Sequence, residues 1–455
     1  MGDMKKRRFP SRARSLLSAS KLPTLAVAIV AAFGAGALAG HGNAAATTGR
    51  ENPYAVLLQL GRVLVHVENG YVDPVDRARL VDGAIKGMVD ELDPHSAYLR
   101  PDEWRQLQSE TEGKFGGVGL EVDGREGELV VIAPIEGGPA ERAGVKSGDR
   151  IVAVDGADAR GQSLDRIVKK MRGAPGTRVK LTVRRGGKET LSFELVREII
   201  RLSSVASKLL DGDVAYIRVK LFQEGTHDEL VRAAAKLRAE AAGRAITGVL
   251  LDMRTNPGGL VDEASEVADE FLSVGGIYSM RRRGQVVEDA RARPGGAFAT
   301  VPVVALVNEW SASAAELVVG ALQDNKRATV VGAGTFGKGS VQTIIDLPGG
   351  GGLKLTTARY FTPAGHAIQG DGIHPDVLMV SGNHVDRERD LPNHLPPEGP
   401  RGGAPPPAPA DAGAAIVVAD GGAPDMIDAR TIPADPSGSS DRVLKAGYEL
   451  LRGKR

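Results

Sequence analysis

The sequence contains no cysteine, few aromatic residues and almost no net charge. The lack of cysteine among 455 residues excludes disulfides, thiolate metal sites, a cysteine nucleophile and a lipid anchor on cysteine. Aromatic residues make up 4% of the chain and the formal net charge is +1, so the composition does not favour nucleic acid as a partner. Any covalent catalysis must therefore use serine, threonine, lysine or a carboxylate.

The N-terminus carries a long stretch without charge. Residues 1–21 hold seven Lys or Arg residues and one acid, and no charged residue follows from Leu22 to Ala46. Three alanines ending at Ala46 offer a small-residue cleavage site. This pattern predicts that residues 1–46 are a signal peptide or an uncleaved membrane anchor. We expect the rest of the chain to be periplasmic, or anchored in the inner membrane and facing the periplasm.

The next two segments differ in periodicity. Residues 50–112 read as helical, with apolar side chains at helical spacing: Val56, Leu60, Val63, Leu64 and Val67. Residues 113–199 read as short β-like runs with glycine turns. One amphipathic helix interrupts these runs and places four apolar side chains on one face: Leu164, Ile167, Val168 and Met171.

The 113–199 segment resembles a PDZ domain over its whole length. The resemblance rests on the "GGPAERAGVKSGDRI" run, on "VDG" ending at Gly156 and on a loop of four residues: Gly117, Val118, Gly119 and Leu120. Consecutive amides in such a loop form an anion site suited to a peptide's C-terminal carboxylate. A strand edge beside the helix, with Leu164, Val168 and Met171, would bind the peptide by β-augmentation. The alternative is that the glycines only make turns and that the helix stripe is only core.

The last segments complete the predicted organisation. Residues 200–384 alternate apolar strands with amphipathic helices, which predicts an α/β domain. Residues 385–439 are rich in Pro, Ala and Gly and are expected to be a disordered linker. Residues 440–455 are expected to form a helix that docks back on the body through three residues: Leu444, Tyr448 and Leu451.

The stretch "VVGAGTFGKGSVQTII" is similar in sequence to two nucleotide-binding motifs. Gly332, Gly334 and Gly337 spell a dinucleotide fingerprint, and Lys338 nearly completes a phosphate-binding P-loop. Both motifs require a helix after the loop, whereas "SVQTIIDL" reads as a strand. The P-loop also needs Ser or Thr after the lysine, where this chain has Gly339. Lys338 is therefore either a catalytic base or a surface lysine.

Two further motifs accompany Lys338, and each allows two interpretations. "VNEWSASAAE" places Ser313 between an apolar strand and a helix, where a nucleophile would benefit from the helix dipole. Ser313 and Glu316 also spell a capping box, and the spacing alone favours capping. "DMRTNPGG" is a strand followed by a tight turn, whose amides either stabilise an oxyanion or only make the turn.

Taken together, these segments resemble the C-terminal processing peptidases, the tail-specific serine endopeptidases of family S41. The resemblance runs from about Leu57 to Val380 and keeps the domain order of that family. The motifs that carry it are "DPHSAYLRPDEW", the PDZ segment, "DMRTNPGG", "VNEWSASAAE", "GAGTFGKGSVQT" and "YFTPAGHAIQGDGIHPDV". It implies a multidomain α+β protein with a helical N-terminal region, a PDZ domain and an α/β core of the crotonase or ClpP type.

The resemblance assigns roles to five positions. Ser313 corresponds to the family's nucleophile, Lys338 to its general base and Gln342 to the residue that orients the lysine. Gly258 and Ala314 correspond to the oxyanion hole. The resemblance implies no cofactor and no metal.

The chemistry of a serine–lysine pair is coherent with these motifs. A lysine with its ordinary pKa of about 10.4 is charged at neutral pH and cannot accept a proton. Burial lowers the pKa of an amine and makes the neutral base available. Gln342 cannot titrate, so it would hold the amine without favouring its charged form. Contact between Lys338 and Gln342 requires a turn-like path at Gly339, because an extended strand would separate them by about 13 Å.

Two residues depart from the family pattern. Trp310 stands where the family often has glycine, which predicts a bulkier rim of the cleft. His95 stands where tyrosine is common, and we assign it no catalytic role. The expected function is cleavage of exported proteins with unstructured, apolar C-terminal tails, with a homo-oligomer or an adaptor protein as further partners. The alternative is a PDZ-based periplasmic scaffold with a latent or inactive core.

Overall fold

The computed structural model describes residues 53–125, 128–135, 137–380, 385–398, 416–417 and 432–453. The predicted signal or anchor at residues 1–46 lies outside these ranges, as does most of the predicted linker. Within these ranges, no helix has both the length and the apolar character needed to cross a membrane. The chain divides into two units, residues 1–80 and 81–455, which are described separately.

The first unit contributes helix α2 (Pro53–Gly70) and the start of α3 (Arg77–Asp90). The apolar stripe that predicted α2 does not form a core within this unit. Val56 and Val63 are 66% and 54% exposed, and Leu64 and Val67 are only half-buried. Arg77 forms an ion pair with Glu68, which ties the start of α3 to the last turns of α2.

Residues 114–201 form a small β-rich unit on a two-stranded stalk. The stalk pairs β2 (Lys114–Gly117) with β9 (Glu198–Arg201) in antiparallel fashion. The sheet has the order β3-β4-β5-β7-β8, with β6 paired to β5. Its strands are β3 (Leu120–Arg125), β4 (Glu128–Pro134), β5 (Arg150–Val154), β6 (Ala157–Asp158), β7 (Arg178–Arg185) and β8 (Glu189–Val196). The helices are α5 (Pro139–Arg142) and α6 (Leu164–Met171).

The α/β core is built on a seven-stranded sheet in the order β10-β11-β12-β15-β16-β19-β20. The strands are β10 (Val205–Leu210), β11 (Val214–Val219), β12 (Gly248–Asp252), β15 (Val303–Val307), β16 (Ala328–Gly332), β19 (Val377–Val380) and β20 (Ile416–Val417). Only β10 runs antiparallel to its neighbour. Strands β11, β12 and β15 are buried along their whole length, as expected for parallel strands covered on both faces.

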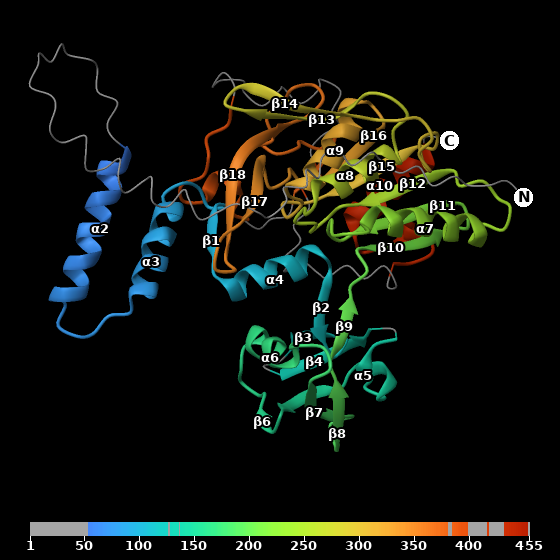
Figure 1. Ribbon diagram of the computed structural model, residues 1–455. Coiled ribbons are helices and arrows are strands. Elements are labelled where there is room, and N and C mark those ends of the chain that lie inside the picture. Colours follow the sequence, from blue (N-terminus) through green and yellow to red (C-terminus); the bar gives the residue numbers. More distant parts are fainter. Residues whose placement is uncertain are drawn as a thin grey trace, which may run out of the picture. The chain divides into compact units, whose positions relative to one another are not determined.

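Different parts of the chain cover the two faces of this sheet. One face packs against α7 (Thr226–Glu240), α8 (Val261–Asp269) and α9 (Ala314–Asp324). The opposite face packs against α10 (Arg442–Gly453), which is red in Figure 1. The side chains of Leu444, Tyr448 and Leu451 are buried against the sheet. The predicted docking of a C-terminal helix through these three residues is confirmed.

A second, five-stranded sheet lies beside the core. Its path is β1-β18-β13-β14, and β17 pairs with β18. The strands are β1 (Ala97–Leu99), β13 (Gly276–Arg282), β14 (Gln285–Arg291), β17 (Ser340–Asp346) and β18 (Gly352–Phe361). Helix α4 (Pro101–Thr111) follows β1, and its Trp104 is buried. This sheet therefore places β17, which follows Lys338, and β1, which follows the N-terminal helices, on opposite sides of β18.

The predicted linker does not begin at residue 385. Residues 385–398 contain the short 3-10 helix η1 (Glu388–Asp390), and Glu388 is fully buried. The backbone N–H of Glu388 donates to the carbonyl of Phe336 at 3.1 Å. Other described parts of the predicted linker are also placed, because β20 pairs with β19 and Ile432 is buried.

Candidate active site

Ser313 occupies a sharp turn between β15 and α9. Its backbone has φ 57° and ψ −119°, a conformation that residues other than glycine rarely adopt. This strand–turn–helix geometry resembles that of a nucleophile elbow, which presents a serine hydroxyl at the end of a strand. Ser313 is partly exposed.

Ser311, the other serine of the S-A-S triplet, has a structural role. It is fully buried, and its Oγ donates to the carbonyl of Met253 at 2.9 Å and accepts from the N–H of Asn308 at 3.0 Å. Of the two hydroxyls, that of Ser313 is therefore the one available to a substrate.

The N-P-G-G turn lies directly against Ser313. A Cβ added to Gly258 would come within 2.8 Å of the Ser313 Cβ and 2.9 Å of the Ala314 nitrogen, so only glycine fits. Ala314 is the first residue of α9, and its N–H has no acceptor within the helix. The N–H of Gly258 donates to Asn256 Oδ1 at 2.8 Å. The predicted oxyanion donors are thus adjacent, but in this conformation Gly258 is engaged within its own turn.

The buried carboxylate of Glu316 joins the serine turn to the lysine loop. Its Oε2 accepts from the N–H of Ser313 at 2.7 Å and from the N–H of Lys338 at 2.9 Å. Its Oε1 accepts from the N–H of Gly337 at 2.7 Å and from the hydroxyl of Thr335. The capping interaction that the sequence suggested, between Glu316 and Ser313, is present. The same carboxylate also accepts hydrogen bonds from the lysine loop.

The charge of Glu316 is held in an unusual environment. Burial raises the pKa of its carboxyl to about 7, although the four hydrogen bonds act in the opposite direction. Sequence reasoning identified Glu316 only as a capping residue. The S-x-x-E spacing was a signal for its contact with Ser313, but no local pattern indicated its contacts with Thr335, Gly337 and Lys338.

Lys338 lies in a largely buried position that lowers its basicity. Burial is the main cause, and the nearby positive charge of Lys354 adds to it; together they lower the pKa of Lys338 to about 8. Three carboxylates oppose the shift: Glu388, Glu316 and Asp93. A pKa near 8 leaves a substantial fraction of the amine neutral under mildly basic conditions, which an ordinary surface lysine does not offer.

The Gln342 side chain forms hydrogen bonds with two residues other than Lys338. Its Nε2 donates to Ser340 Oγ at 2.9 Å and to Thr356 Oγ1 at 3.2 Å. Residues 334–339 follow an irregular path, but β17 begins at Ser340 and is extended, which carries the Gln342 side chain toward β18. A β-bulge between Val341 and Gln342 interrupts the pairing with β18, and the contact expected between Lys338 and Gln342 stays a prediction.

Asp93, from the "DPHS" motif, also forms a hydrogen bond with Thr356. Its carboxylate accepts from the hydroxyls of Ser96 at 2.6 Å and Thr356 at 3.0 Å. Burial raises the pKa of Asp93, but these and the backbone hydrogen bonds outweigh it and leave the pKa lowered. The Thr356 hydroxyl thus connects Asp93 to Gln342.

His95 and Glu388 form a second long-range contact near the site. His95 Nε2 lies 2.7 Å from Glu388 Oε2, and Gln369 Nε2 donates to Glu388 Oε1 at 2.8 Å. The sequence did not predict this contact, because 293 positions separate its two residues. It fastens the 385–398 segment to the turn that precedes β1.

The predicted peptide-binding residues of the β-rich unit divide into two groups. Val118 and Met171 are 3% and 5% exposed and belong to the core of that unit. Leu120 and Val168 are partly buried, and Leu164 is 37% exposed. For Met171 the alternative interpretation, that the helix stripe is core, therefore holds, and the Val118 side chain of the loop is core as well.

The predicted carboxylate loop, residues 117–120, turns at Gly119. Gly119 adopts a positive φ of 73°, and the carbonyls of Val118 and Gly119 accept from the N–H groups of Ala140 and Ile135. Strand β3 lies at the end of its sheet and pairs only with β4 among the described strands. Its outer edge is therefore open to an added peptide strand.

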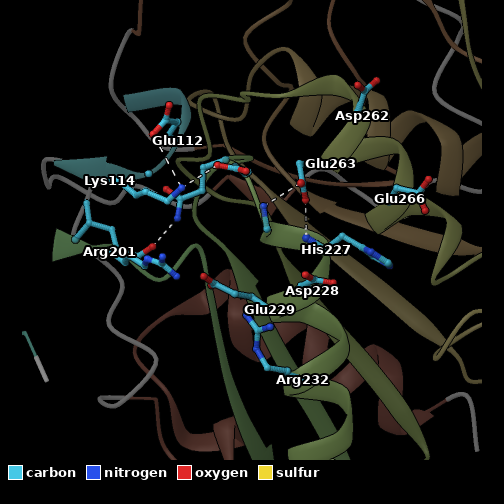
Figure 2. Close-up of a pocket in the computed structure, with 15 residues that line it drawn as sticks. Glu112, Lys114, Arg201, His227, Asp228, Glu229, Arg232, Asp262, Glu263 and Glu266 are labelled. Carbon is cyan, nitrogen blue, oxygen red and sulfur yellow. Dashed lines mark hydrogen bonds and ion pairs between the residues drawn. The ribbon is translucent and has the colours of Figure 1, made fainter. Parts of the chain in front are cut away.

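A polar cavity of about 590 Å³ lies where the stalk meets the core (Figure 2). Seven carboxylates and three Lys or Arg residues line it, and Lys114 of the stalk contacts Glu224 at 3.1 Å. It contains neither Ser313 nor Lys338, and its polarity does not suit an apolar tail. Next to it, the N–H of Phe222 donates to the carbonyl of Gly258 at 2.9 Å, which connects this region to the N-P-G-G turn.

The structure around the lysine loop does not match either of the two nucleotide-binding motifs. The segment after Lys338 is strand β17 rather than a helix, as expected, so no helix N-terminus is available there to hold phosphates. Within the described ranges, no cluster of three or more His, Asp or Glu side chains is arranged to hold a metal ion.

Three family models match successive parts of the chain. The model of peptidase family S41 matches residues 213–379, a PDZ domain model matches 130–185, and the model of the activating protease CtpB N-terminal domain matches 42–102. Among solved structures, the photosystem II D1 C-terminal processing protease is 31% identical with a TM-score of 0.45, covering 70% of this chain and 86% of that one.

Relatives of known family extend over most of the chain. The carboxy-terminal-processing protease of Bartonella bacilliformis is 42% identical over 335 residues, which cover 73% of this chain and 77% of the relative. The carboxy-terminal processing protease CtpA of Bacillus subtilis is 34% identical over 321 residues, which cover 70% of this chain and 68% of the relative. With this level of identity across its helical, PDZ and peptidase regions, the chain belongs to the carboxy-terminal processing proteases of peptidase family S41.

Proposed function

We propose that the protein is a serine endopeptidase in which Ser313 is the nucleophile and Lys338 is the general base. One observation carries the proposal: a single oxygen of Glu316 accepts hydrogen bonds from the backbone N–H groups of both residues. A strained serine turn and a largely buried lysine of lowered pKa are thereby held together. This is the combination that serine–lysine catalysis requires, because the base must be neutral and close to the hydroxyl.

Acylation begins with the neutral amine of Lys338. As Ser313 Oγ attacks the scissile carbonyl carbon, the hydroxyl proton passes to Lys338 Nζ and the carbonyl oxygen becomes an oxyanion. The N–H of Ala314 and the dipole of α9 stabilise that negative charge. Gly258 would contribute its N–H after releasing Asn256 Oδ1. Lys338 then donates its proton to the leaving amine, and the C–N bond breaks.

Deacylation repeats the proton transfers with water. Lys338 removes a proton from a water molecule that attacks the ester carbonyl, and the oxyanion again forms at the same site. Collapse of the intermediate breaks the bond to Ser313 Oγ, which recovers its proton from Lys338. Gln342 would orient the amine of Lys338 without adding a charge.

We further propose that the PDZ domain selects unstructured proteins by their apolar C-terminal tails. The open edge of β3 supports strand addition, and the 117–120 loop supports carboxylate binding. The partly exposed Leu164 and Val168 supply the apolar contacts. Contacts from the stalk through residues 222–224 to Gly258 support communication between the PDZ domain and the peptidase site.

The proposed setting is outside the cytoplasm. The basic, then uncharged N-terminus supports export or anchoring in the inner membrane. Substrates would then be exported proteins, with a homo-oligomer or an adaptor as further partners.

A peptide-cleavage assay separates this proposal from a scaffold with an inactive core. The chain without residues 1–46 is incubated with an unstructured peptide that ends in apolar residues. We expect cleavage by the parent and none by Ser313→Ala or Lys338→Ala. Cleavage by Ser313→Ala at the parental rate would refute the proposed nucleophile, and peptide binding without cleavage in every form would favour the scaffold.

A further inference from the structure

A buried charge network lies under the N-P-G-G turn, on the sheet face that α10 covers. Asp252 at the end of β12 is fully buried, and Arg254 is 5% exposed. Arg254 Nε donates to Asp252 Oδ1 at 2.9 Å, and its Nη2 donates to Asp252 Oδ2 at 2.6 Å. Burial raises the pKa of Asp252, but its contacts with Arg254 and Arg218 outweigh burial and leave the pKa lowered. The pair is therefore charged and fixed in geometry.

The remaining donor of Arg254 reaches the C-terminal helix. Arg254 Nη1 donates to both carboxylate oxygens of Asp441, at 2.9 and 2.8 Å. Asp441 immediately precedes α10, and its Oδ1 also accepts from the N–H of Leu444 at 2.9 Å, as a helix N-cap does. One carboxylate thus both caps α10 and completes the hydrogen bonding of Arg254.

Arg254 precedes the N-P-G-G turn, residues 256–259, which we call the oxyanion turn because Gly258 is a proposed oxyanion donor. Two residues later, Asn256 Nδ2 donates to the carbonyl of Val219 at 2.9 Å, and the carbonyl of Asn256 accepts from the N–H of Ala312 at 2.9 Å. Asn256 Oδ1 accepts from Gly258. The backbone that Arg254 anchors therefore sets the position of Gly258 and of the residue before Ser313.

Helix α10 is attached to the sheet along its length. A Cβ on Gly447 would lie 2.6 Å from Leu306, so the helix backbone packs directly on β15. At the far end, Asp211 accepts from the Tyr448 hydroxyl and from Arg452 Nη2 at 2.8 Å. The helix is thus fixed at both ends and packs on β12 along its length, and its end at Asp441 is the one that hydrogen-bonds Arg254.

From this geometry we infer that Asp441 is a positioning residue for the proposed peptidase reaction, acting through Arg254 on the oxyanion turn. The C-terminal helix is then part of the catalytic unit, although in sequence it lies beyond the Pro/Ala/Gly-rich region. This inference rests on the proposed function, because the turn matters only if an oxyanion forms there. The resemblance to S41 peptidases ended near Val380 and assigned no role to this helix.

The test compares four variants of the chain without residues 1–46 in one peptide-cleavage assay. Asp441→Asn keeps the size of the side chain and the capping ability but removes the charge that holds Arg254. We expect kcat for peptide cleavage to fall about tenfold with KM nearly unchanged, because misplacement affects the transition state rather than substrate binding. The affinity for a peptide aldehyde, whose hemiacetal oxygen occupies the oxyanion site, should fall by a similar factor. Asp441→Glu should recover part of both losses.

Two controls separate positioning from general support of the fold. Glu449→Gln changes the same charge on an exposed part of α10 and should leave kcat unchanged. Asp211→Asn loosens the far end of the helix and should lower the melting temperature while kcat is retained. Parental kcat in Asp441→Asn, or an equal loss in Asp211→Asn, would overturn the inference. An inactive parent would instead overturn the proposed function, and this inference with it.

Discussion

The PDZ domain and the peptidase core differ in what they bury. The core of the PDZ domain is apolar, and its buried charged residues are Asp149 and Arg197 among those described. The peptidase core buries several charged groups around its site, including Asp252, Arg254, Glu316 and Glu388, and largely buries Lys338. Buried charges contribute little net stability, since desolvation offsets their attraction. Their greater number in the peptidase core fits the proposal that they place the reacting groups there.

This difference predicts two kinds of mutational effect. Changes to the buried charges of the core should lower kcat, because they act on the transition state. Changes to the exposed apolar residues of the PDZ domain should raise KM, because they act on substrate capture.

The largest expected effect comes from Ser313→Ala or Lys338→Ala. Each should lower kcat/KM by at least about 10⁴-fold, as removal of a nucleophile or its base does in serine hydrolases. Fluorescence anisotropy with a labelled apolar-tailed peptide should show unchanged binding to the PDZ domain. Ser311→Ala is the matched control: it removes a buried hydrogen bond, with a cost of about 1–3 kcal/mol in stability, but should retain the chemistry. An inactive, fully folded Ser311→Ala beside an active Ser313→Ala would reverse the two assignments.

Glu316→Gln should have the next largest effect. The amide retains one acceptor oxygen in place of two, so it cannot satisfy the N–H groups of Ser313, Gly337 and Lys338 as the carboxylate does. We expect kcat to fall roughly 100-fold, since small displacements of reacting groups have effects of that size. Glu240→Gln, an exposed change of the same kind, should have no effect on steady-state kinetics. Parental kcat in Glu316→Gln would mean that the shared carboxylate does not hold the site together.

The pH profile should report the neutral amine of Lys338. Because burial and Lys354 lower its pKa to about 8, kcat/KM should rise about tenfold per pH unit below that value and level off above it. Lys354→Gln removes a nearby positive charge, which raises the pKa of Lys338 and moves the rising limb to higher pH. Lys354→Arg keeps the charge and should keep the profile. A limb that does not move in Lys354→Gln would assign the titration to another group.

The PDZ substitution should give a smaller change, in KM. Leu164 is 37% exposed at the start of α6, so Leu164→Gln preserves the fold but removes an apolar contact. We expect KM for an apolar-tailed peptide to rise about threefold to tenfold with kcat unchanged, the range that partial burial of one leucine supports. Val196→Gln, on β8, alters an equally exposed apolar residue and should leave KM alone. A loss in kcat rather than KM would contradict the division of roles between the domains.

Local patterns in the sequence predicted the elements well. Alternation and helical spacing identified the strands and helices of the core, and the stripe of Leu444, Tyr448 and Leu451 predicted the docked α10. The strand after Lys338 was the reason to reject both nucleotide fingerprints. These features depend on neighbours in the chain, and periodicity reports them directly.

Such local patterns could not predict contacts between segments that lie far apart in the chain. The hydrogen bond of Gln342 with Thr356 on β18 is one of these. His95 contacts Glu388 although 293 positions separate them, and no periodic pattern in the sequence relates the two residues. Glu316 could be recognised as a cap but not as the link to the lysine loop, because that role exists only once the strand order is fixed. Val118 and Met171 became core residues for the same reason.

The backbone of Ser313 shows that this enzyme is less stable than its fold allows. A residue with a Cβ at φ 57° and ψ −119° raises the energy of the folded state by about 1–3 kcal/mol, and glycine would relieve it. Ser313→Gly should therefore melt at a higher temperature than the parent, whereas Ser313→Ala keeps the Cβ and should not. Both variants would be inactive, so calorimetry can measure the strain separately from the chemistry. Under the proposed mechanism, the conformation that presents Ser313 to the substrate lowers thermal stability, which limits how far the protein can be stabilised without loss of activity.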